Sequence, residues 1–84
     1  MNMMLGECNK LIKQEQLFDY NIYDEHEFRP NEICVRKLKH AYIVFVISER
    51  CEPMESTLEE CMTEPEALES LIYRLREHNR LFHK

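Results

Sequence analysis

The cysteines and histidines are among the side chains of this 84-residue chain that could act as nucleophiles, bases or metal ligands, and there are four of each. A cysteine nucleophile needs a histidine base close by and a third group that orients this base. Cys34, Cys51 or Cys61 could pair with His26 or His40, but no flanking motif or oxyanion-hole loop accompanies them. We therefore predict no catalytic residue and expect reduced thiols, most of them packed as small apolar side chains.

Patterns typical of metal and nucleotide sites are also missing. The cysteines form no Cys-x-x-Cys pair, and His78 and His83 are five positions apart, which takes them off a common helix face. Gly6 is the only glycine, so no glycine-rich phosphate loop can be written. We expect neither a metal ion nor a cofactor.

Carboxylates are the most abundant reactive groups, with 16 Asp and Glu against 11 Lys and Arg and a net charge of −5. General acid–base chemistry would need a walled cleft, which a domain of this size rarely encloses, so solvated surface is the simpler interpretation. Eight glutamates and the single base Arg50 lie between positions 49 and 69. Because such charge repels phosphate backbones and anionic headgroups, we expect neither nucleic acid nor a membrane as partner.

The hydrophobic pattern predicts the elements that would position these groups in one α+β domain over residues 1–84. Apolar residues at helical spacing predict a helix from 4 to about 17. Alternating or β-branched runs predict strands at 20–22, 32–38, 41–48 and, weakly, 54–58. Thr63, Pro65 and Glu66 form a helix start, so a second helix is expected over 64–80.

The predicted architecture is thus an N-terminal helix, a three- to four-stranded antiparallel β-meander, and a C-terminal helix packed on the sheet. Strand 41–48 is apolar on both faces, so either helices cover both faces of the sheet or one face meets a partner. No apolar run approaches the ~18–20 residues of a membrane span, and the first residues lack the pattern of a signal peptide. We expect a cytoplasmic location.

The segment 66–76, Glu-Ala-Leu-Glu-Ser-Leu-Ile-Tyr-Arg-Leu-Arg, follows the apolar segment 41–50 and an acidic connection. Over residues 30–80 this arrangement resembles the small bacterial immunity proteins of polymorphic and contact-dependent toxin systems. The chain departs from the pattern at Cys51-Glu52-Pro53, where a glycine turn is more usual. The resemblance implies one-to-one binding and inhibition of a cognate toxin domain, without catalytic residues.

An acidic inhibitor suits a basic, nucleic-acid-degrading toxin, because opposite charges accelerate association. We expect a binding surface of acidic side chains around an aromatic anchor. The acidic candidates are Asp24, Glu25, Glu27, Glu52, Glu55, Glu59 and Glu60, and the aromatic candidates are Tyr20, Tyr23 and Tyr42. The alternative is a homo-oligomeric structural or regulatory domain, such as a homodimer, which would cover an exposed face of strand 41–48.

Overall fold

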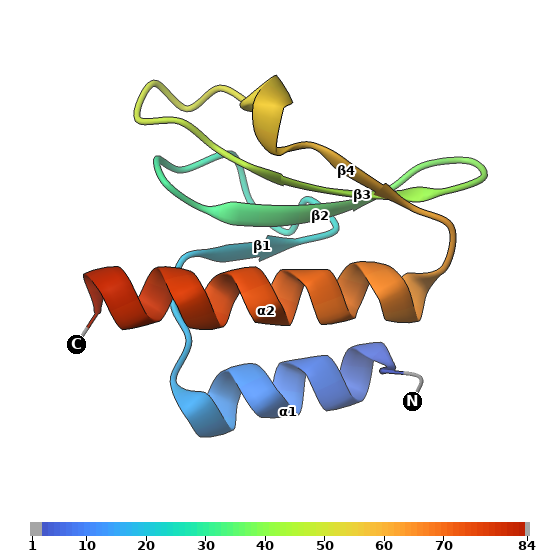
Figure 1. Ribbon diagram of the computed structural model, residues 1–84, viewed down its shortest axis with the longest axis horizontal. Coiled ribbons are helices and arrows are strands. Elements are labelled where there is room, and N and C mark those ends of the chain that lie inside the picture. The colour runs from blue at the N-terminus through green and yellow to red at the C-terminus, as the bar shows by residue number, and fades with distance from the viewer. Residues whose placement is uncertain (1–2, 84) are drawn as a thin grey trace.

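Two α-helices and a four-stranded sheet make up the computed structural model, which describes residues 3–83 (Figure 1). The elements follow in the order α1 (Leu5–Glu15), β1 (Tyr20–Ile22), β2 (Ile33–Lys37), β3 (Tyr42–Val46), η1 (Glu55–Thr57), β4 (Glu59–Cys61) and α2 (Glu64–Phe82). The predicted α+β class is confirmed. No helix within residues 3–83 is both long and apolar enough to cross a membrane.

The sheet has the strand order β1-β2-β3-β4, in which β2 pairs antiparallel with β3, β3 pairs antiparallel with β4, and β1 pairs parallel with β2. The prediction of a purely antiparallel meander is therefore wrong. After β1, segment 23–32 returns the chain to the end of the sheet at which β1 began. Strand β2 therefore runs in the same direction as β1, instead of following it through a tight turn. Left-handed backbone conformations at Tyr23, Asp24 and Asn31, with φ of 56°, 54° and 64°, bend this segment.

The connection after β3 differs from the strand predicted over 54–58. The hydroxyl of Thr57 donates to the carbonyl of Met54 at 2.6 Å and accepts the N–H of Val46 at 2.9 Å. This side chain closes residues 55–57 into the 3-10 turn η1, which satisfies backbone groups that a strand would otherwise pair. The edge strand is instead β4, and its exposed glutamates discourage pairing with another chain.

Helix α2 begins where its capping residues predict and continues to Phe82. The Oγ1 of Thr63 accepts the N–H of Glu66 at 3.4 Å, and Pro65 occupies the first turn. One apolar stripe of the helix is buried, and it consists of Ala67, Leu68, Leu71, Ile72 and Leu75. Figure 1 shows α2 between the sheet and α1, so the domain has three layers with its main core around α2.

The other face of the sheet, here called the outer face, has no α-helix over it within residues 3–83. Its centre is a small second core of Cys34, Phe45 and Ile47, each at most 2% exposed. Phe28 and Ile43 pack against this core and are only partly buried. Segment 23–32 supplies Phe28, so a loop takes the place that a helix has on the opposite face.

Candidate protein-binding surface

Segment 23–32 is held in place by two buried polar side chains. The amide of Asn21 in β1 accepts the N–H of Glu25 at 3.1 Å and donates to the carbonyl of His26 at 2.9 Å. Glu32, which is 4% exposed, lies 2.8 Å from Nε2 of His26 and accepts the N–H of Arg29 at 3.3 Å. Fully paired buried polar groups rigidify their surroundings, so the loop is pre-organised.

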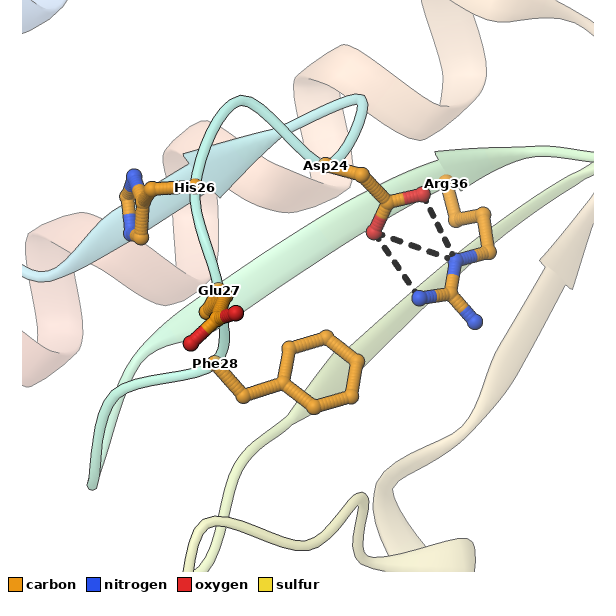
Figure 2. A pocket seen from close by; sticks show the side chains of 5 residues that line it. All are labelled: Asp24, His26, Glu27, Phe28 and Arg36. Carbon is orange, nitrogen blue, oxygen red and sulfur yellow. Dashed lines mark hydrogen bonds and ion pairs between the residues drawn. The ribbon is translucent and has the colours of Figure 1, made fainter.

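A shallow hollow of about 590 Å³ opens beside this loop on the outer face, lined by Asp24, His26, Glu27, Phe28 and Arg36. Figure 2 shows the carboxylate of Asp24 facing the guanidinium of Arg36, with Nη2 to Oδ1 at 2.8 Å and Nε to Oδ2 at 3.0 Å. The hydrogen bonds that Arg36 donates to the carboxylate of Asp24 raise the pKa of Arg36. The guanidinium carbon also lies 5.3 Å from the centre of the Phe28 ring, within cation–π range.

From this hollow, a row of neighbouring side chains continues across the paired strands of the sheet. Arg36 in β2 pairs with Ile43 in β3, and Ile43 pairs with Glu60 in β4. Paired residues point to the same face of a sheet, so the three side chains lie side by side on the outer face. We call the surface formed by Asp24, Glu27, Phe28, Arg36, Ile43 and Glu60 the outer-face patch.

The structure brings together only some of the acidic residues expected at a binding surface. Asp24, Glu27 and Glu60 belong to the outer-face patch, and Glu25 is exposed next to it on the same loop. The carboxylate of Glu59 turns toward α2, where it accepts a hydrogen bond from Arg74 at 3.2 Å.

Glu52 and Glu55 are exposed in the connection between β3 and β4. This connection also contains Cys51, whose φ of 63° is the left-handed conformation that usually favours glycine.

The three tyrosines lie on the other side of the sheet from the outer-face patch. Tyr20, Tyr23 and Tyr42 are half-buried and pack against the main core on the α2 face. The hydroxyl of Tyr23 donates to the carboxylate of Glu64, and burial, followed by this hydrogen bond, raises the pKa of Tyr23. The three tyrosines therefore do not form a single surface with Asp24, Glu27 and Glu60.

Phe28, Arg36 and Ile43 are the patch residues that were not among the binding candidates predicted from the sequence. Phe28 stands alone between Glu27 and Arg29 in a polar loop, and an aromatic residue in such a loop was the available signal. Arg36 interrupts an apolar strand at a position that alternation assigns to the same face as Cys34.

One cluster of possible metal ligands occurs within residues 3–83, formed by Asp19, His78 and His83. Its ligand atoms all lie within 4.8 Å of one another. The five-residue spacing of His78 and His83 predicted that they would not share a helix face, but this prediction assumed that both residues lie in one continuous helix. Because α2 ends at Phe82, the backbone of His83 leaves the helical path with φ −132° and ψ 57°.

The thiols differ in their exposure to solvent. Cys8, Cys34 and Cys61 are buried, whereas Cys51 is exposed. Burial raises the pKa of Cys8 to about 11 and that of Cys34 to about 12, and it also raises the pKa of Cys61. Since the thiolate is the reactive form, the buried thiols are poor nucleophiles at neutral pH.

We expect one rapidly reacting thiol in the native protein at about pH 8, near the usual thiol pKa. Titration with an aromatic disulfide reagent should show this fast phase in the wild type and its loss in Cys51→Ser. In denaturant, all four cysteines of the wild type should react. Two or more fast thiols in the native state would contradict the burial of the others.

Comparison of the chain with models of protein families, with curated proteins and with solved structures finds no match. Its function must therefore be inferred from its own residues.

Proposed function

We propose that this protein is an immunity protein, which binds a cognate toxin domain one-to-one and neutralises it. The proposed toxin is basic and degrades nucleic acid, and the proposed contact surface is the outer-face patch. The observation that carries this proposal is a sheet face without an α-helix, where a pre-organised loop places acidic and apolar side chains together. The sequence resemblance to immunity proteins supports the same function.

The composition of the patch fits protein recognition. Phe28 and Ile43 supply a partly exposed apolar centre above the small core. Glu27 and Glu60 are exposed, and neither forms an ion pair with another residue in the range 3–83. An apolar centre with a charged rim is the usual anatomy of a protein interface, in which the centre contributes most of the binding free energy.

The acidic stretch between positions 49 and 69 extends the negative charge beyond the patch. Its glutamates lie in the β3–β4 connection, in β4 and in the first turns of α2, along the side of the sheet that β4 borders. Summed over this side, the charge would attract a basic partner over distances longer than a contact. The rate of association should therefore depend strongly on salt.

The direct test uses a candidate toxin domain, to be sought among the proteins encoded next to this one. Producing that domain in bacteria should stop growth, and co-production of this protein should restore it. The association rate of the purified pair should fall at least about tenfold as ionic strength rises from about 0.01 M to about 1 M, because the screening length shortens from about 30 Å to about 3 Å. Failure to restore growth together with an absence of binding would refute the proposal for that pair.

Charge reversal locates the contact surface. The double variant Glu27→Lys/Glu60→Lys should associate with the toxin at least about tenfold more slowly than the wild type at low salt. The matched control is Glu7→Lys/Glu77→Lys, which makes the same change in net charge at exposed positions on the helices, outside both the outer-face patch and the acidic stretch. Equal rates for the two double variants would contradict a contact at the outer-face patch, because a field effect alone depends on net charge.

The partial exposure of Ile43 on a face without an α-helix also suits the alternative, a homo-oligomer in which a second copy covers this face. Light scattering at high protein concentration separates the two proposals. A monomer leaves the face open for a toxin. A dimer that Ile43→Glu dissociates would favour the oligomer.

A further inference from the structure

We infer that Asp19, His78 and His83 form a binding site for a divalent transition-metal ion, with Zn²⁺ as the best match. This site lies where the C-terminal end of α2 meets the segment that precedes β1, and it is independent of the function proposed above. Its ligands come from distant parts of the sequence, since Asp19 lies 59 positions before His78 and 64 positions before His83.

The three side chains converge on one point. Nε2 of His78 lies 2.8 Å, and Nε2 of His83 lies 2.6 Å, from the same Oδ2 of Asp19. In a tetrahedral zinc site with bonds of about 2.0–2.1 Å, neighbouring ligand atoms are about 3.3–3.4 Å apart. An ion could therefore enter if these two nitrogen–oxygen distances opened by roughly 0.5–0.8 Å, a change that side-chain rotation can supply.

Buried hydrogen bonds position two of the three ligands. The amide of Asn79, which is 7% exposed, accepts the N–H of Phe18 at 2.8 Å and donates to the Phe18 carbonyl at 3.0 Å. The carbonyl of Asp19 in turn accepts the N–H of Ile33 at 2.9 Å. Asp19 is thus fixed between β2 and α2, and His78 is the residue next to Asn79 on the helix.

One phenylalanine ring packs beside each of the two imidazoles. The ring centre of His78 lies 4.9 Å from that of Phe82, and the ring centre of His83 lies 5.3 Å from that of Phe18. The side chains of Asp19 and His83 are about one-third exposed, so an ion can reach the site. An adjacent hollow of about 320 Å³, lined in part by Asp19 and His78, leaves room for water on the ion.

The donor set decides which ions fit. Two imidazole nitrogens and one carboxylate oxygen are typical ligands of Zn²⁺ and also suit Ni²⁺, Cu²⁺ and Co²⁺. Ca²⁺ and Mg²⁺ prefer a shell made only of oxygen atoms. In the metal-free arrangement each Nε2 donates its hydrogen to Asp19, whereas a bound ion needs the lone pair of that nitrogen. Binding must therefore place the imidazole proton on Nδ1 or release it.

Calorimetric titration of tag-free protein with Zn²⁺ tests the site, since a polyhistidine tag would bind the ion itself. We expect one ion per chain with a dissociation constant of about 10 μM or below. Co²⁺ should give visible absorption bands typical of tetrahedral coordination. Nitrogen chemical shifts of His78 and His83 should show loss of the Nε2 hydrogen when Zn²⁺ is added, which a purely structural ion pair would not show.

His83→Ala is the decisive variant, because His83 follows the end of α2 and its loss leaves the core intact. It should weaken Zn²⁺ binding at least about tenfold, in the range that metal-site substitutions commonly produce. The matched controls are His40→Ala, in the exposed β2–β3 turn, and Cys51→Ser, which removes the exposed thiol. Unchanged binding in His83→Ala, loss of binding in either control, or the absence of one-to-one binding would overturn the assignment.

Discussion

Replacing Phe45 with alanine is expected to lower the free energy of unfolding by about 3–5 kcal/mol. The ring is 2% exposed and fills the centre of the outer-face core, where Phe28 contacts it edge-on with ring centres 6.0 Å apart. No α-helix lies over this face within residues 3–83, so little nearby structure could collapse into the cavity. Urea unfolding followed by circular dichroism measures the loss.

The size of this effect matters because a domain of this length has a total stability of only about 4–13 kcal/mol. Phe45→Leu, which preserves most of the volume, should cost less than about 1.5 kcal/mol and serves as the folded control. Phe28→Ala removes a half-buried ring from the same cluster and should cost about 1 kcal/mol. A loss below about 1 kcal/mol in Phe45→Ala would mean that the outer face has no real core.

Asn79→Leu is expected to lower the free energy of unfolding by about 2–4 kcal/mol, although it exchanges a polar residue for an apolar one of similar size in a buried site. The amide of Asn79 bonds both backbone groups of Phe18 and the carbonyl of Leu75. Leucine would leave the N–H and the carbonyl of Phe18 without these partners, and each unpaired buried group costs about 1–3 kcal/mol. The same unfolding assay measures the change.

Two further variants make the interpretation of Asn79 specific. Asn79→Asp keeps an acceptor for the N–H of Phe18 but loses the donor, so an intermediate loss of stability is expected. Asn9→Leu places the same side chain at an exposed position of α1 and should change stability by less than about 0.5 kcal/mol. Equal effects of Asn79→Leu and Asn9→Leu would contradict the role of the hydrogen bonds.

Local signals made part of this fold predictable. The signals that define α2 are local, because the Thr63 cap, Pro65 and the apolar spacing around Leu71 lie within a few residues of one another. The helix predicted over 64–80 therefore differs little from the observed one. The same is true of β3, whose β-branched and aromatic residues favour a strand wherever it lies in the sheet.

The remaining features depend on contacts between distant segments. The parallel pairing of β1 depends on bends at Tyr23 and Asn31 and on the two hydrogen bonds that the side-chain amide of Asn21 makes to segment 23–32. None of these features produces a periodic pattern in the sequence. A strand that is apolar on both sides does not reveal which face α2 will cover. Sequence reasoning therefore could not assign the tyrosines to the α2 face or Phe28 to the outer face, and it overlooked the cluster around Asp19.

The position of α2 between the sheet and α1 has a consequence for the order of folding. The side chain of Asn79 holds the backbone of Phe18, 61 residues earlier in the chain, and Arg76 bonds Glu15 across the same interface. During translation, α1 and the strands emerge from the ribosome without the helix that buries their apolar side chains. These contacts join segments that are far apart in the sequence, so we expect folding to be completed only after α2 is released from the ribosome.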